Sequence, residues 1–369
     1  MRNYTHGGDK YAALWSEKES LTILDFSANT NPLGMPKNVK EKTMASIEYS
    51  DAYPDPFARK LTQKICEKHA KNHGMEIPNS WVVCGNGAAD LIFRTVYGLD
   101  LKKVLIPSPT FSEYEDALRE KNILVENFYL KEENNFEFTE EILEKLENKL
   151  EEKIDGVFIC NPNNPVGNLI NPRLMDEILK KSKERNIYAF VDECFLELTG
   201  KERDYSLVPK LKDYDNLVIF KAFTKTYAMA GLRLGYIISS NEEITDKIFS
   251  IGQPWSVSTP AQAGGIAALD ENYYVEKSVA YIKEQRKILE EFLKAWNFKV
   301  YKGYANYIFF YHKKGKIFLE EMKKRGILIR NCENYRGLTE GYMRIAIKSE
   351  SENRIFMERG KEILEWLNQ

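Results

Sequence analysis

Short apolar runs alternate with amphipathic segments through the middle of this 369-residue chain. Residues between them, such as 172–185, have helical spacing of apolar side chains and one charged face. Strands that alternate with helices in this way predict an α/β domain around a largely parallel sheet. The apolar runs that predict its buried strands lie at 81–84, 104–106, 157–160, 187–192, 217–220 and 234–238.

The chain divides into three predicted parts. Residues 50–245 contain the alternating pattern and are expected to form a large α/β domain. From 246 to 369 the pattern changes to long helices such as 272–296 and 317–326, which indicates a smaller α+β domain. Residues 1–49 are rich in turns and are expected to join it. The predicted strands of the smaller domain lie at 307–311, 327–330 and 342–347.

Composition excludes several classes of protein. Lys and Arg (53) nearly balance Asp and Glu (55), so no basic field indicates a nucleic-acid partner. No apolar run is long enough to span a membrane, and the N-terminal residues lack the apolar core of a signal peptide. The five cysteines are widely spaced without a CxxC pair, so we expect reduced thiols in a cytoplasmic protein.

One group of residues resembles a metal site. His69 and His73 are four residues apart and share a helical face near Cys66. Two lysines and an asparagine surround them, however, and Gly74 is typical of a helix end. We therefore expect no metal site in this protein.

Glycine and polar residues gather where the predicted strands end, which is where open α/β sheets bind their ligands. Gly87 and Ala88 follow a strand and open a helix, where backbone N–H groups favour an anion. A dinucleotide fingerprint needs a third glycine where Asp90 stands, so a single phosphate suits this loop better. A purely structural turn is the alternative.

The segment TKTYAMAGLRLGY, residues 224–236, contains a candidate nucleophile. Burial disfavours the charged form of a lysine, so Lys225 is predicted to be an amine that can condense with an aldehyde to a Schiff base. Thr224 and Arg233 beside it can bind a phosphate. A surface loop with ordinary basic residues is the alternative.

Three more strand ends offer groups that suit a flat aromatic ligand. Asp192 ends an apolar run, and a buried carboxylate needs a cationic partner such as a protonated pyridine nitrogen. Asn164, in the turn NPNNPVG, offers an amide to a phenolate oxygen, and Phe111 offers a ring face. An internal ion pair, a structural turn and a core position are the respective alternatives.

Arginines near the end of the chain suggest an anionic substrate. Arg330 and Arg344 end or interrupt predicted strands, where a guanidinium can bind a carboxylate or a phosphate in bidentate fashion. Two such arginines suggest a substrate with two anionic groups. Asn29, in a turn-rich segment, and Asn306, in ANYIFF, are further candidates for substrate contacts.

In this order, the motifs resemble those of the class I/II aminotransferase family, whose members use pyridoxal 5′-phosphate (PLP) on fold type I. HGG (6–8), LDFSANTNPLGMP (24–36), QPWSV (253–257) and ILIRNCENYRGL (327–338) are similar to segments of its threonine-phosphate decarboxylases. Phe195 also resembles that group, because the aminotransferases usually have a tyrosine there. Ser258 departs from it, because the decarboxylases often have an asparagine.

The resemblance implies a role for each candidate. Lys225 would form the Schiff base with PLP, Asp192 would bind the pyridine nitrogen, Asn164 the phenolate oxygen, and Phe111 would stack on the ring. The cofactor phosphate would be bound by a set of residues that includes one from a second copy of the chain, which implies a homodimer. That set is Gly87, Ala88, Thr224, Arg233 and Tyr53 of the partner subunit.

The substrate implied is a small phosphorylated amino acid. Arg344 would bind its carboxylate, Arg330 and His6 its phosphate, and Asn29 and Asn306 would complete the substrate site. The reaction implied is decarboxylation of threonine phosphate, as in cobalamin biosynthesis. Transamination of histidinol phosphate is the alternative, and an inert binding protein with this fold is disfavoured by the intact catalytic residues.

Overall fold

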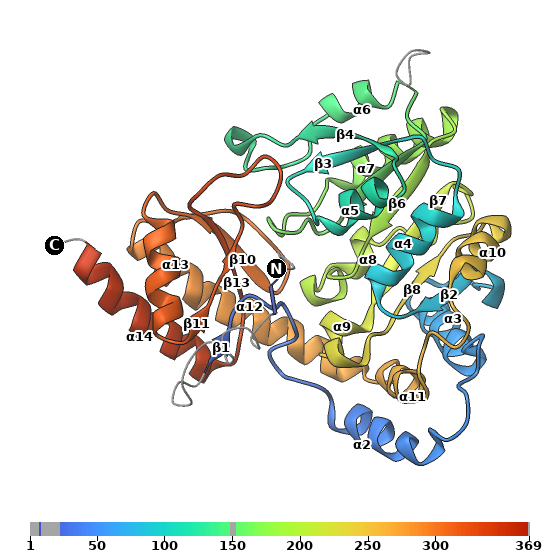
Figure 1. Ribbon diagram of the computed structural model, residues 1–369, viewed down its shortest axis with the longest axis horizontal. Helices are drawn as coiled ribbons and strands as arrows, with labels where there is room; N and C mark the ends of the chain where they lie inside the picture. Colours follow the sequence, from blue (N-terminus) through green and yellow to red (C-terminus); the bar gives the residue numbers. More distant parts are fainter. Residues whose placement is uncertain (1–6, 9–22, 148–152, 368–369) are drawn as a thin grey trace.

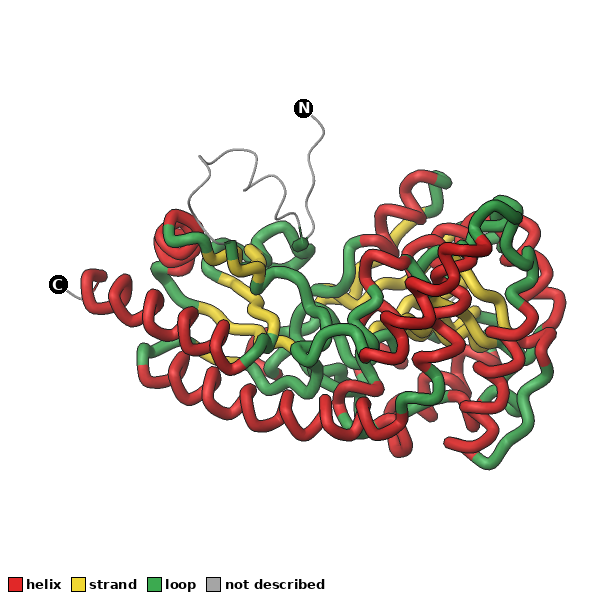
Figure 2. The backbone as a smooth tube through the Cα atoms, turned by 90° about the horizontal axis from the view of Figure 1, so that it is seen from below, coloured by secondary structure: helices red, strands yellow, loops and turns green. Residues whose placement is uncertain are grey.

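The computed structural model describes residues 7–8, 23–147 and 153–367. Two bodies lie side by side, and the helix α12 (Asn272–Ala295) passes from one to the other (Figure 1). The larger body surrounds a seven-stranded sheet, and the smaller contains a four-stranded sheet and a two-stranded one. Seen from below, helices lie on both sides of the strands of the larger body (Figure 2).

The seven-stranded sheet is mostly parallel, as the sequence predicts. Its strand order is β2-β8-β7-β6-β5-β3-β4, and β8 is antiparallel to both of its neighbours while the other pairs are parallel. Its strands are β2 (Val82–Gly85), β3 (Lys103–Ser108), β4 (Leu124–Tyr129), β5 (Gly156–Cys160), β6 (Tyr188–Asp192), β7 (Leu217–Ala222) and β8 (Gly235–Ile238).

Helices cover both faces of this sheet, so its central strands are apolar on both sides. In β5, for example, Phe158 packs among residues of one helical layer and Ile159 among residues of the other. One layer consists of α4 (Ala88–Gly98), α5 (Glu113–Glu120) and α10 (Glu242–Ile251). The other includes α3 (Arg59–His73), α6 (Glu141–Lys145) and α7 (Pro172–Glu184).

The smaller body is an antiparallel sheet covered by helices, which confirms the predicted α+β arrangement. Its core includes the fully buried Phe310, Phe318 and Phe356. The sheet order is β12-β13-β10-β9, formed by β9 (Lys299–Val300), β10 (Tyr307–Tyr311), β12 (Arg330–Asn331) and β13 (Tyr342–Ala346). The helices beside it are α12, α13 (Gly315–Lys324) and α14 (Glu350–Leu367).

The N-terminal segment contacts both bodies. Its strand β1 (Leu24–Asp25) pairs in parallel with β11 (Ile327–Leu328) of the smaller body. Its helix α2 (Lys37–Ala45) packs on α11 (Thr259–Ala268), and Val39 belongs to the core cluster of the large sheet. The division at residues 49/50 and 245/246 therefore stays a prediction.

Some elements differ from the expectation, among them the two-residue strands β1 and β9, which were not predicted. The strand predicted at 327–330 is two short strands, because the chain pairs first with β1 and then, from Arg330, with β13. The edge strand β4 has no predicted counterpart, because it is half-exposed and its sequence mixes apolar residues with Glu126 and Asn127.

Short helical segments complete the chain, among them α8 (Glu202–Tyr205) and α9 (Phe223–Thr226). The 3₁₀ turns are η1 (Ser46–Tyr49), η2 (Asn79–Trp81), η3 (Glu132–Asn134), η4 (Glu197–Thr199), η5 (Val208–Lys210) and η6 (Ala230–Leu232).

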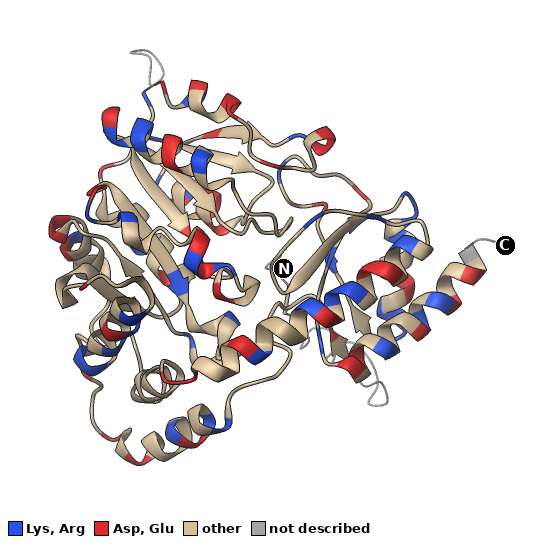
Figure 3. Cartoon of the chain, turned by 180° about the vertical axis from the view of Figure 1, so that it is seen from behind, with Lys and Arg blue, Asp and Glu red and all other residues tan. Residues whose placement is uncertain are grey.

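Surface charge is mixed along the helices, where acidic and basic residues alternate (Figure 3). All five cysteines are free thiols. Among the described helices, none combines the length and the apolar character that crossing a bilayer requires.

Candidate active site

The candidate residues of the large sheet meet at one edge, where its parallel strands end. Asp192 is the last residue of β6, and α9 with Lys225 directly follows β7. Asn164 follows β5. Arg233 precedes the antiparallel strand β8 and therefore lies at the same edge. This is the location at which open α/β sheets bind ligands.

The N-terminus of α4 and Arg233 form a cradle suited to an anion. Gly87 has φ +87°, and a Cβ built on it would lie 2.5 Å from Nη2 of Arg233. A Cβ on Gly235 would lie 2.7 Å from the backbone nitrogen of Ala88, so the two segments approach closely. Backbone N–H groups at a helix N-terminus and a guanidinium together favour a phosphate. Thr224 is buried in the adjacent α9.

Lys225 is a half-buried lysine whose amine lies among other charged groups. Burial, and then the positive charge of Arg344, lowers the pKa of Lys225 to about 8. Arg233 lowers this pKa further, while Cys194 and Asp192 raise it. Its Nζ lies 5.3 Å from the ring centroid of Phe195. The lysine is therefore partly neutral, and hence nucleophilic, near neutral pH.

Asp192 is held in place by two donors. The hydroxyl of Tyr114 donates to Oδ2 of Asp192 at 2.6 Å, and the backbone nitrogen of Cys194 donates to Oδ1 at 2.9 Å. Burial, and then the charge of Asp192, raises the pKa of Tyr114 well above its usual value, so the tyrosine keeps its proton. The carboxylate is 6% exposed and is oriented rigidly at the strand end.

Phe111 and Tyr114 belong to one aromatic group at the start of α5. Their ring centroids are 5.6 Å apart and the rings are nearly perpendicular, at 84°. Tyr114 also stacks on Phe158 of the core at 4.9 Å. The core thus supports Tyr114, and Tyr114 in turn positions Phe111 and Asp192.

Arg344 joins the smaller body to this edge. It is 5% exposed, and its Nη1 donates to Oδ1 of Asn164, in the turn after β5. Its Nη2 donates to the carbonyl of Ser27 at 3.1 Å. When the side-chain amide of Asn29 is oriented with its oxygen toward Arg344, this oxygen accepts from Nε of the arginine at 3.2 Å. Within the described residues, the hydrogen-bond acceptors of this guanidinium are all neutral oxygens.

Arg330 lies directly opposite Arg344, because the two pair in register on β12 and β13. Its Nη2 donates to Oδ1 of Asn334 at 2.9 Å, and its guanidinium lies 5.0 Å from the ring centroid of Tyr335. Like Arg344, it forms no ion pair with a carboxylate of the described chain. Two buried cations side by side without an acidic partner constitute a site for anions.

Asn306 is buried in the smaller body, where only one of its two polar side-chain atoms forms a hydrogen bond within the described residues. Its Nδ2 donates to the carbonyl of Thr30 at 3.2 Å, while its buried Oδ1 has no hydrogen-bond partner in the described part of the chain. Tyr53 is 78% exposed and stacks on Trp255 at 4.3 Å. His6 lies outside the described residues. The roles of these three residues stay predictions.

The sequence does not single out two tyrosines that the fold brings to the site. Tyr114 binds Asp192, and the hydroxyl of Tyr335 accepts from Nη1 of Arg344 at 3.4 Å. The short spacing from Phe111, just before α5, to Tyr114 in its first turn is a signal for the first. Tyr335 has no comparable signal, because it lies in a turn and its partner Arg344 lies on the separate strand β13.

A cavity of about 560 Å³ adjoins the site between the two bodies. Phe111 and Ser112 line one side, and Tyr335 and Arg336 line the other. Arg336 bridges the bodies with two hydrogen bonds to Glu115, at 2.8 and 2.6 Å. The cavity is large enough for a small substrate.

Comparisons with known proteins agree with this geometry. The family model "Aminotransferase class I and II" matches residues 22–359. The chain belongs to that family. A threonine-phosphate decarboxylase from Salmonella typhimurium is 33% identical over 95% of this chain and 94% of its own. A histidinol-phosphate aminotransferase from Methanocaldococcus jannaschii is 28% identical, covering 93% of this chain and 89% of its own.

A solved structure agrees with the family assignment. The crystal structure of a histidinol-phosphate aminotransferase from Clostridium acetobutylicum superposes with a TM-score of 0.84 at 34% identity, covering 93% of this chain and 99% of that one. The fold of this aminotransferase-family chain is therefore fold type I of the PLP-dependent transferases, as the sequence predicts.

We predict that Gly87→Ala weakens phosphate binding at the cradle. The added methyl group meets Arg233 and strains a positive φ, so the affinity for PLP and for inorganic phosphate should fall about tenfold or more. Calorimetric titration of cofactor-free protein measures both. Gly231→Ala is the control, because a Cβ there meets no atom within 4 Å. Equal affinities in the two variants would contradict the cradle.

We also predict that Lys225 reacts at lower pH than an ordinary lysine. Its pKa of about 8 means that the neutral amine appears as the pH rises through 8, instead of near 10.5. Acylation of cofactor-free protein, followed by peptide mass spectrometry, should give half-maximal labelling of Lys225 near pH 8. Lys221 is the internal control, because its pKa is raised. Preferential labelling of Lys221 would contradict the assignment.

Proposed function

We propose that this protein uses PLP to decarboxylate L-threonine O-3-phosphate to (R)-1-amino-2-propanol O-2-phosphate, a reaction of cobalamin biosynthesis. The observation that carries the proposal is the pair of buried arginines, Arg330 and Arg344, on neighbouring strands. A small substrate with a carboxylate and a phosphate supplies the two negative charges that these cations lack. The 33% identity to a threonine-phosphate decarboxylase supports the same substrate.

The chain's own residues fit the cofactor. The cradle of Gly87, Ala88, Thr224 and Arg233 suits its phosphate, and Asp192 suits a protonated ring nitrogen. When bound, PLP supplies an electron sink for a bond broken at the substrate Cα. Lys225 supplies the amine that holds the cofactor, and Phe111 offers an aromatic surface beside the ring position.

Within this scheme the smaller body positions the substrate. Arg344 binds the carboxylate and Arg330 the phosphate, so the molecule is fixed at both ends. Which bond at Cα breaks depends on the orientation that these two anchors impose. Asn29 and Asn164 hold the Arg344 guanidinium, so they act on the substrate through that arginine.

Phe195 favours decarboxylation over transamination as the reaction. Its ring is packed edge-on against Tyr307 at 5.1 Å and has no hydroxyl to donate to a cofactor oxygen. Asn164 is then the amide that we expect to bind that oxygen. A tyrosine at position 195 is the feature that the sequence resemblance associates with the aminotransferases.

A second candidate is transamination of histidinol phosphate. The 34% identity to the Clostridium acetobutylicum aminotransferase over 93% of this chain favours it. The same cofactor site would serve, and Arg330 would again bind a phosphate. The reactions differ in whether the bond to the carboxylate or the bond to hydrogen breaks at Cα.

We predict that the purified enzyme with PLP releases carbon dioxide from threonine phosphate. The assay traps labelled gas from carboxyl-labelled substrate, and a parallel reaction tests histidinol phosphate with 2-oxoglutarate for glutamate. Arg330→Gln should raise the KM for threonine phosphate by about tenfold or more, because a charged contact is lost. Glutamate formation without labelled gas would replace the first candidate with the second.

We further propose a homodimer in which Tyr53 completes the phosphate site of the partner. Tyr53 is exposed on the single chain, beside the exposed Trp255. Homodimers with two-fold symmetry are the commonest oligomers of soluble proteins. Sedimentation should show a dimer. Mixing Lys225→Ala with Tyr53→Ala subunits should restore about a quarter of the wild-type activity, since half of the dimers then contain one intact site.

Subunit exchange in that mixture is verified with differently tagged chains. An active monomer, or a mixture of exchanged subunits no more active than either variant, would contradict the proposal. Lys225→Ala mixed with wild-type chains is the control for the exchange itself.

A further inference from the structure

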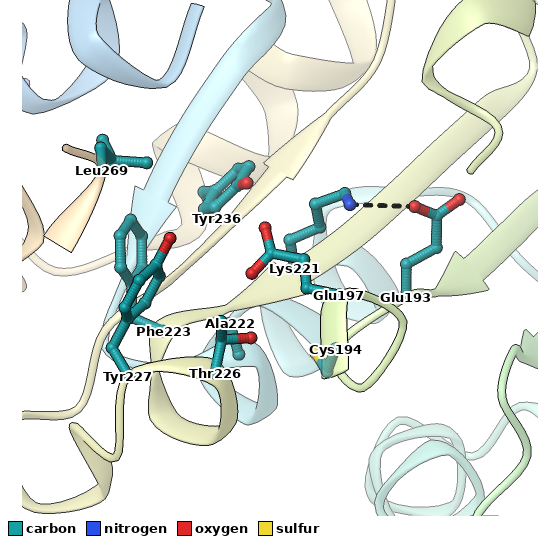
Figure 4. Close-up of a pocket in the computed structure, with 10 residues that line it drawn as sticks. All are labelled: Glu193, Cys194, Glu197, Lys221, Ala222, Phe223, Thr226, Tyr227, Tyr236 and Leu269. Atoms are coloured by element: carbon teal, nitrogen blue, oxygen red, sulfur yellow. Dashed lines mark ion pairs between the residues drawn. The ribbon is translucent and has the colours of Figure 1, made fainter. Parts of the chain in front are cut away.

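A second cluster of charged groups is buried around Lys221, which lies on β7. Lys221 is 3% exposed, and its Nζ lies 3.1 Å from a carboxylate oxygen of Glu193 and 2.9 Å from one of Glu202. Figure 4 shows Lys221 and Glu193 pointing toward each other, with Glu197 and Tyr236 beside them. The candidate active site does not use any of these side chains.

Two histidines from α3 reach this cluster. His69 and His73 are four residues apart in the last turns of the helix, and their rings stack with centroids 5.6 Å apart. Nε2 of His69 lies 3.0 Å from the hydroxyl of Tyr236, which connects the histidine to the cluster. His69 is 1% exposed.

Each histidine has a buried ring nitrogen without a hydrogen-bond partner among the residues that the structure describes. These atoms are Nδ1 of His69 and Nε2 of His73. Buried polar atoms are almost always hydrogen-bonded, so two such nitrogens on neighbouring rings require an explanation. A ligand that accepts nitrogen lone pairs would satisfy both.

Glu202 completes a set of three ligand groups. One ligand atom from each of His69, His73 and Glu202 lies within 4.8 Å of the others. No ion pair joins this carboxylate to either histidine in the described chain, so the three groups face one another without direct contact. The space between them is therefore suited to an ion that binds all three.

The charges of the cluster also favour a cation. Three carboxylates, those of Glu193, Glu197 and Glu202, surround the single ammonium group of Lys221. A neutral imidazole adds no positive charge and is the form that binds metals.

We propose that His69, His73 and Glu202 bind a divalent transition metal ion, with Zn²⁺ as the best match. Two imidazoles and one carboxylate are a common zinc ligand set, and they leave one position open for water. This proposal reverses the expectation of no metal site. The expectation considered Cys66 as the third ligand, whereas the fold brings Glu202 from a distant segment and leaves Cys66 out of the group.

The position of this site suggests a structural effect. A metal would tie the end of α3 to α8, and Glu202 is linked through Lys221 to β7. The segment of Lys225 follows β7 directly. We therefore expect metal binding to stabilise the strand that positions the candidate active-site lysine.

The test uses untagged holoenzyme that has been dialysed against EDTA and then against metal-free buffer. Titration with Co²⁺ should produce the visible absorption of a tetrahedral cobalt site at one equivalent per chain, and Zn²⁺ should displace it. His73→Gln should weaken Co²⁺ binding about 100-fold. His312→Gln is the matched control, because it removes a half-buried histidine outside the cluster and should bind Co²⁺ as the wild type does.

Thermal melting of the same proteins gives a second readout. Added Zn²⁺ should raise the Tm of the wild type and of His312→Gln, and should leave that of His73→Gln unchanged. If His73→Gln does not fold, Glu202→Gln replaces it in both measurements. Absence of stoichiometric Co²⁺ binding in the wild type, or equal binding in His73→Gln and His312→Gln, would overturn the proposal.

Discussion

The contact between Arg344 and Asn164 is the interaction on which the candidate site depends. Arg344 stands on the small sheet and Asn164 follows a strand of the large sheet, so their hydrogen bond joins the two bodies at the ligand position. Neutral oxygens hold the guanidinium without neutralising it. A buried cation held in this way keeps its attraction for an anion, and in the proposed function that anion is the substrate carboxylate.

Two lysines four residues apart illustrate how the surroundings determine chemistry. Lys221 is buried and Lys225 is half-buried near the end of β7, yet the pKa of Lys221 is raised and that of Lys225 is lowered. Burial disfavours the charge of each, but Glu202 and Glu193 reverse the outcome for Lys221. Lys225 is instead placed near Arg344, so its lowered pKa suits the proposed role of nucleophile, while Lys221 forms buried ion pairs.

The sequence predicted the large sheet well because its central strands are buried on both faces and appear as apolar runs. The half-exposed β4 lacks such a run, so it was not predicted, and the strand predicted at 327–330 is divided between two sheets, which the local pattern does not reveal. Likewise, Gly87 and Arg233 each suggested a phosphate, but their approach to within contact distance follows from the pairing of β2 with β8.

The sequence by itself determined the fold class, the family and the segments that contain Lys225 and Asp192, because apolar periodicity and short motifs are local properties of the chain. Only the tertiary structure decided which groups meet: Tyr114 with Asp192, Arg330 with Arg344, and Glu202 with His69 and His73. The physical reason is that a buried polar group must find its partner wherever packing brings one, and packing joins segments that are far apart in the sequence.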